Sequence, residues 1–156
     1  MAKVRNHNTY VDFRGSFTPI ELDCKPKLVT NWDQVNISIN DKKGTFRGLH
    51  YQDVPQQKYI KVVQGRIIDY IYHLKTKVLQ SFYLENQNSI FVSKDYAHGF
   101  LTLDDNTIVC YLTEGEYLPN KEHSIPYNTI PELKENILQY FSNEELILTD
   151  KDKKGK

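Results

Sequence analysis

Hydrophobic and polar residues alternate with a period of two through the centre of this 156-residue chain. The alternation is clearest at residues 59–64 and, after Gly65, at residues 66–73, which predicts two consecutive strands. Further strands are predicted at residues 80–85, 89–93, 99–103 and 107–113. Short strands at this spacing, separated by Asn, Asp, Gly and Lys, are typical of a β-sandwich or barrel. The pattern therefore predicts an all-β fold with few short helices, forming one domain over residues 1–156.

Only residues 131–138 carry a helical pattern. Pro131 suits a first helical turn, and Leu133 and Ile137 are four residues apart, so they would share one face. The C-terminal residues 151–156 are charged, and we expect the last few to be frayed.

The strand predicted at residues 66–73 mixes apolar and titratable side chains on one face. Because alternate residues share a face, one side of this strand carries two isoleucines, a carboxylate and an imidazole: Ile67, Asp69, Ile71 and His73. The other side carries Ile68, Tyr70 and Tyr72. This parity predicts an apolar barrel interior that contains a polar site.

A second group of charged and titratable side chains lies at residues 47–52, Arg-Gly-Leu-His-Tyr-Gln. It supplies a cation and a titratable imidazole, Lys58 follows, and a second imidazole occurs at His98. A base beside cations is suited to proton transfer at a site where an anion forms. Arg47 and His50 differ in parity, however. Only a bulge or twist near Gly48 would bring them together, and the sequence leaves this point open.

Charge and composition narrow the class of protein. Twenty basic and twenty acidic residues give zero formal charge, so no nucleic-acid or anionic-membrane partner is indicated. Cys24 and Cys110 are far apart and are expected to be reduced thiols without a catalytic role. The first residues lack the apolar region of a signal peptide, and no stretch approaches transmembrane length, so a cytoplasmic location is expected.

The chain resembles the nucleotide-diphosphate-4-keto-6-deoxyhexose 3,5-epimerases, a family of cupin enzymes. The resemblance rests on residues 47–52 followed by Ala97-His98-Gly99-Phe100, and it includes matching segments at 12–15, 34–36, 65–69, 117–119 and 148–152. It implies a cupin-type jelly-roll barrel or sandwich and a cofactor-independent isomerase without a metal. It also implies a nucleotide-diphosphate sugar substrate and a homodimer.

The resemblance also implies roles for individual residues. His50 would be the general base, paired with Asp152. Lys58 would stabilise the charge that develops on the C4 oxygen, and Tyr111 would return a proton from the opposite sugar face. The implied substrate-binding set is Arg47, which would hold the diphosphate, with Gln34, Asn36, Asp69, His98, Tyr117 and Arg14, the last reaching the partner's nucleotide site. Asp150 is the alternative partner of His50 if the match slips by two residues.

Several departures from the family pattern leave alternatives open. His73 replaces a second carboxylate in the family's strand motif, and the segment after Arg14 lacks the acidic residue implicated in recognising the nucleotide, which puts thymidine in doubt. The alternatives are a single-centre epimerase or 3,4-ketoisomerase on a similar nucleotide sugar, and a non-catalytic sugar-nucleotide-binding cupin. A metal cupin fits poorly, because residues 50–52 read His-Tyr-Gln and Lys58 lies near the place of the acidic ligand.

Overall fold

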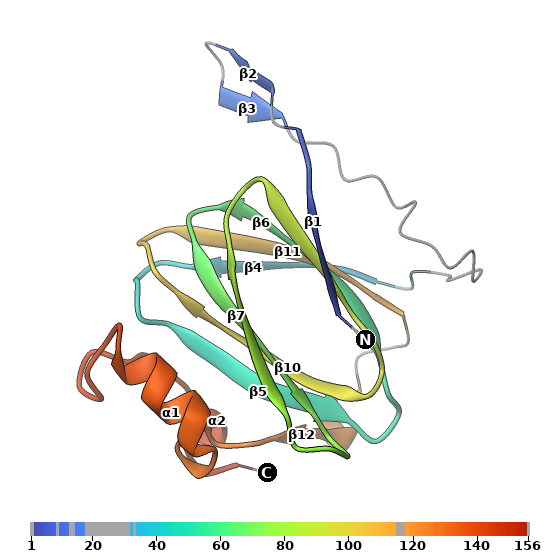
Figure 1. Ribbon diagram of the computed structural model, residues 1–156, viewed down its shortest axis with the longest axis vertical. Helices are drawn as coiled ribbons and strands as arrows, with labels where there is room; N and C mark the ends of the chain where they lie inside the picture. Colours follow the sequence, from blue (N-terminus) through green and yellow to red (C-terminus); the bar gives the residue numbers. More distant parts are fainter. Residues whose placement is uncertain are drawn as a thin grey trace.

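The computed structural model describes residues 2–8, 10–12, 15–17, 32, 34–114 and 118–155. Two five-stranded antiparallel sheets lie face to face (Figure 1). The first has the order β1 (Lys3–Asn6), β9 (Asn88–Val92), β6 (Gln57–Gln64), β11 (Thr107–Glu114) and β4 (Gln34–Asn40). The second has the order β12 (Glu122–Ser124), β5 (Phe46–Gln52), β10 (Tyr96–Thr102), β7 (Ile67–His73) and β8 (Leu79–Leu84). The predicted all-β fold is confirmed.

The remaining elements are short. β2 (Tyr10–Asp12) and β3 (Gly15–Phe17) form a separate pair. The 3-10 helices are η1 (Pro119–Lys121) and η2 (Tyr127–Thr129), and the α-helices are α1 (Pro131–Leu138) and α2 (Asp150–Lys154). The predicted helix at residues 131–138 is confirmed, with Leu133 and Ile137 both buried. Within the described residues, no helix has the length and apolar character needed to cross a membrane.

The two faces of the second sheet border two different hydrophobic clusters. Ile67 and Ile71 pack between the sheets with residues such as Ile60 and Val109. Residues of opposite parity, including Ile68 and Tyr70, pack with the buried face of α1 outside the sandwich. This is the parity predicted for β7, and buried Asp69 lies on the face toward the first sheet.

A bulge joins β5 to β10. His50 is the cross-strand partner of His98, and Arg47 is the partner of Phe100, so two residues of β5 oppose one residue of β10. The close approach requires glycine on both strands: a Cβ on Gly48 would lie 2.6 Å from the Cα of Gly99. The bulge answers the question left open by the sequence, because it allows Arg47 and His50 to line the same pocket.

Candidate active site

The largest group of sequence-predicted site residues lines one pocket of about 380 Å³ between the two sheets. Its walls come from β4, β5, β6, β10, β11 and β12, and seven predicted residues line it: Gln34, Asn36, Arg47, His50, Lys58, His98 and Tyr111. Asp69 lies fully buried beneath this surface, and Asp152 lies beside His50. The other two predicted residues, Arg14 and Tyr117, are outside the described residues.

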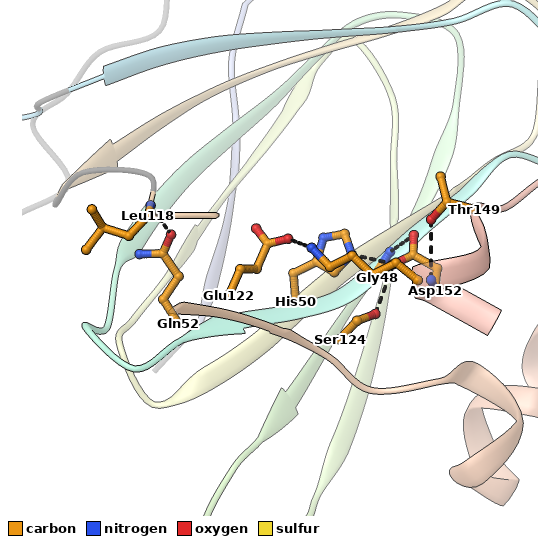
Figure 2. Close-up of polar contacts among 9 residues, drawn as sticks. Gly48, His50, Gln52, Leu118, Glu122, Ser124, Thr149 and Asp152 are labelled. Atoms are coloured by element: carbon orange, nitrogen blue, oxygen red, sulfur yellow. Dashed lines mark hydrogen bonds and ion pairs between the residues drawn. The ribbon is translucent and has the colours of Figure 1, made fainter. Parts of the chain in front are cut away.

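His50 and Asp152 form a hydrogen-bonded pair. The distance from His50 Nε2 to Asp152 Oδ1 is 2.6 Å, although the two residues are 102 positions apart (Figure 2). An ionised carboxylate can only accept, so this contact places the imidazole proton on Nε2 and the basic lone pair on Nδ1. Asp152 is only 3% exposed, which excludes a solvated tail charge, and the alternative Asp150 is exposed. The geometry therefore selects Asp152 as the partner of His50.

Three groups donate hydrogen bonds to the Asp152 carboxylate. Besides His50, the Ser124 hydroxyl lies 2.9 Å from Oδ1, and the Gly48 N–H lies 3.4 Å from Oδ2. Burial opposes ionisation of this carboxyl, but the contacts with His50, Ser124 and Gly48 outweigh it, and the pKa of Asp152 lies below its ordinary value. The carboxylate is thus held in its charged form beside the imidazole.

A second imidazole–carboxylate pair forms the deeper part of the site. His98 Nε2 lies 2.7 Å from Asp69 Oδ1, and both residues are buried. Burial raises the pKa of Asp69 and lowers the pKa of His98, while the attraction between the two groups opposes both changes. The two pKa shifts have the same cause, because apolar surroundings disfavour the charged form of each side chain.

Lys58 brings a positive charge into the same pocket. Burial lowers the pKa of Lys58 from 10.5 to about 8, and the nearby carboxylate of Asp69 acts in the opposite direction. The ammonium is therefore still mainly protonated at neutral pH, yet it is poorly solvated. A cation in this condition interacts strongly with an anion that forms beside it.

The remaining predicted residues lie on the walls. Arg47 donates from Nε to Asn40 Oδ1 at 2.7 Å, which orients its guanidinium at the pocket surface. Tyr111, on β11, faces the pocket from the first sheet, whereas His50 belongs to the second. The Asn36 side chain donates to the Tyr111 carbonyl at 3.4 Å and so links β4 to β11 beside the pocket.

Two other histidines have local roles. His73 Nδ1 accepts hydrogen bonds from the backbone N–H groups of Lys75 and Thr76, so it caps the turn after β7. His123 pairs with Asp53 at 2.6 Å on the surface. Neither imidazole lines the pocket between the sheets.

Sequence reasoning missed the residues of β12 and α2 that surround the His50–Asp152 pair. Ser124 contacts Asp152, and Lys151 forms an ion pair with Glu122, which itself lines the pocket. No periodicity marks a three-residue strand or a five-residue charged helix. The available signal was Thr149, an N-cap residue type, three positions before Asp152.

The described residues contain no group of three or more His, Cys, Asp or Glu side chains that could hold a metal ion. The two imidazoles of the pocket each contact their own carboxylate, and a cation is their neighbour. Two carboxylate-paired imidazoles beside an ammonium make a poor donor set for a divalent ion.

Comparison with known proteins gives consistent results. A model of the dTDP-4-dehydrorhamnose 3,5-epimerase family matches residues 4–156. The 3,5-epimerase of Mycobacterium tuberculosis is 39% identical over 101 residues, covering 59% of this chain and 50% of that protein. A dTDP-4-dehydrorhamnose 3-epimerase from Streptomyces niveus is 31% identical over 101 residues, covering 59% of this chain and 48% of that protein. The chain thus spans about half the length of these two relatives.

A solved structure extends the likeness over almost the whole fold. The 3,5-epimerase from Bacillus anthracis, with TDP and PPi bound, superposes with a TM-score of 0.75 at 30% identity, covering 98% of this chain and 91% of that one. This likeness confirms the predicted cupin-type fold. On the match over residues 4–156, the chain belongs to the dTDP-4-dehydrorhamnose 3,5-epimerase family.

Proposed function

We propose that the protein is a cofactor-independent isomerase that inverts C3, C5 or both centres of a nucleotide-diphosphate-4-keto-6-deoxyhexose. One observation carries this proposal. A carboxylate-paired imidazole, a desolvated ammonium and a phenol border one pocket, and the imidazole and the phenol come from opposite sheets. Simple binding of a sugar does not require this combination.

The first step of the proposed reaction is removal of a proton by His50. A hydrogen on the carbon next to the C4 ketone is acidic, because its loss gives an enolate. The Nδ1 lone pair of His50 takes this proton, and the ring becomes an imidazolium. The Asp152 carboxylate, 2.6 Å from Nε2, holds the ring in the required tautomer and stabilises the new positive charge.

The second requirement is stabilisation of the enolate oxygen. Lys58 lines the same pocket as His50, and its low degree of solvation strengthens its interaction with a developing negative charge. His98 lines the pocket as well, and because its Nε2 is engaged by the Asp69 carboxylate, its Nδ1 lone pair is a candidate acceptor for a substrate hydroxyl.

The third step is return of a proton to the other face of the sugar. We assign this role to Tyr111, and its location on β11 of the first sheet, across the pocket from β5, supports the assignment. Delivery from the face opposite to the base inverts the carbon centre. Arg47, at the pocket surface, would hold the diphosphate through its planar fork of donors.

The direct test is NMR of the reaction in deuterated water. The protein is incubated with a nucleotide-linked 4-keto-6-deoxyhexose, first with thymidine as the nucleoside and then with other nucleosides. Deuterium at both C3 and C5 supports double epimerisation, and deuterium at one centre supports the narrower enzyme. No incorporation with any nucleotide would refute the enzymatic proposal in favour of a sugar-nucleotide-binding module.

The single-centre alternative has a specific basis, since the related protein of Streptomyces niveus is described as a 3-epimerase. Single and double epimerisation both proceed through the same type of enolate intermediate. The position of the proton donor relative to the two carbons decides between them. The deuterium pattern therefore tests specificity separately from the assignment of the base.

We also propose that the protein acts as a homodimer. β4 is an edge strand, and it presents Val35, Ile37 and Ile39 outward with 63%, 67% and 61% exposure. A contiguous apolar stripe of this kind is typical of a protein interface. Light scattering should give a dimer mass that Ile37→Lys reduces, whereas Val78→Lys, which alters a valine outside the stripe, should not change it. A wild-type monomer would contradict this part of the proposal.

A further inference from the structure

Ser124 is placed to control the orientation of the Asp152 carboxylate. In the register between β12 and β5, Ser124 is the direct cross-strand partner of His50. Their side chains converge on a single atom, because His50 Nε2 and the Ser124 hydroxyl contact the same Oδ1 at 2.6 and 2.9 Å (Figure 2). Ser124 is 5% exposed, so water has little access to replace its hydroxyl.

The Asp152 side chain needs such a partner. The last torsion of an aspartate side chain has a broad preference, so it does not fix the carboxylate plane by itself. Donors on both oxygens do fix it: Ser124 and His50 on Oδ1, and the Gly48 N–H on Oδ2. The β5 bulge at Gly48 therefore contributes to orienting the carboxylate as well as to placing Arg47.

The helix that carries Asp152 is attached to the same strand as Ser124. Lys151 forms an ion pair with Glu122, two residues before Ser124 on β12. At the start of α2, the Thr149 hydroxyl accepts a hydrogen bond from the Asp152 N–H at 3.3 Å. At its end, a Cβ on Gly155 would lie 3.1 Å from the Ser124 carbonyl oxygen. The Lys151–Glu122 ion pair and the Ser124–Asp152 hydrogen bond therefore attach α2 to β12 on either side of the carboxylate.

We propose that Ser124 is a positioning residue for proton abstraction, acting only through Asp152. Its hydroxyl holds Oδ1 on the line of the His50 Nε2–H bond, so that the imidazole keeps its tautomer and its orientation in the pocket. Ser124 has no contact with the substrate in this account. The inference rests on the proposed function, and it adds a residue that residue type and spacing along the chain do not reveal.

A double-mutant cycle tests this directly. Ser124→Ala should lower kcat about tenfold and leave KM within about twofold, since the loss falls on the chemical step. Ser124→Thr keeps the hydroxyl and should restore most of kcat. In an Asp152→Asn background, Ser124→Ala should have no further effect, because the carboxylate on which it acts is gone. Ser81→Ala, which removes an exposed hydroxyl on β8, is the control.

Equal losses of kcat in both backgrounds would overturn the proposal, as would wild-type kcat in Ser124→Ala. A second readout does not depend on turnover: in protein labelled with ¹⁵N-histidine, Ser124→Ala should speed solvent exchange of the His50 Nε2 proton. Unchanged exchange would refute the positioning role even in a protein without activity. Inactivity of the wild type, by contrast, would refute the proposed function.

Discussion

The half-buried Lys58 carries a poorly solvated ammonium that should destabilise the folded protein, and a substitution can measure this effect. Lowering the Lys58 pKa from 10.5 to about 8 corresponds to a penalty of about 3 kcal/mol when the group is protonated. Lys58→Met keeps the aliphatic stem and removes the charge. The pKa of about 8 already includes the attraction of Asp69, so removing the charge should give a net gain of up to about 3 kcal/mol in the free energy of unfolding at pH 7.

The sign of this effect changes with pH in a defined way. The folded-state pKa of Lys58 is below the unfolded value, so the penalty is fully present below pH 8. It is relieved as the pH rises from about 8 to 10.5, where both states lose the proton. Urea unfolding of wild type and Lys58→Met should therefore give a large difference at pH 7 and a small one near pH 10.5.

Lys61 provides a matched control on the same strand. Burial also lowers its pKa to about 8, but it faces away from the pocket, and its Nζ donates to the Val62 carbonyl at 2.9 Å. Lys61→Met should raise stability as well and leave turnover unchanged. Lys58→Met should reduce turnover by about a hundredfold or more. A Lys58→Met protein that is less stable than wild type at pH 7, or equally active, would refute this reasoning.

Three further predictions concern pH, the dyad and a buried hydroxyl. Turnover should fall as the pH rises through about 8, where Lys58 loses its proton; a flat rate between pH 7 and 9 would argue against its role. Asp152→Asn should lower kcat by about 10- to 100-fold, because a charge-assisted hydrogen bond to His50 is worth about 1.5–3 kcal/mol; unchanged kcat would count against the dyad. The buried Thr113 hydroxyl on β11 has no partner among the described residues, whereas the hydroxyl of Thr107, on the same strand, donates to the Asp104 carbonyl at 2.8 Å. Thermal unfolding should therefore show that Thr113→Val stabilises and Thr107→Val destabilises, each by about 1 kcal/mol, and the reverse order would be inconsistent with these contacts.

The sequence predicts the elements whose apolar side chains face a hydrophobic cluster. The strands β6 to β9 and β11 agree with the predicted ranges to within about two residues, which is the usual uncertainty of element ends. β10 begins at Tyr96, three residues before the predicted start, because Ala97 and His98 pair with β7 before the apolar run begins.

β4 was not predicted as a strand, although its polar and apolar residues alternate with a period of two as strand residues do. Its polar residues Asn36 and Ser38 line the pocket, and its apolar residues Val35, Ile37 and Ile39 are exposed, although Ile37 and Ile39 also border the pocket. A pattern that assumes apolar side chains face inward would assign the wrong face of such a strand to the interior. The exception coincides with the site, where the interior must be polar.

The residues of the candidate site were predicted largely through the family resemblance. How they come together in space is seen only in the structure. The pairing of His50 with Asp152 depends on α2, a charged helix without an apolar face, which is held by a cap and by contacts with β12. The bulge at Gly48 depends on the mutual fit of two strands. Both are tertiary effects, so neither periodicity nor local propensity contains them.

The most direct test of the account is solvent exchange catalysed by His50→Ala. The variant and the wild type are incubated with the same nucleotide 4-keto-6-deoxyhexose in deuterated water, and deuterium incorporation into the sugar is followed by NMR. His123→Ala is the control, since it removes an imidazole that is also paired with a carboxylate but lies outside the pocket. We predict rapid incorporation with wild type and His123→Ala and none with folded His50→Ala. Incorporation by His50→Ala at the wild-type rate would show that another group removes the proton.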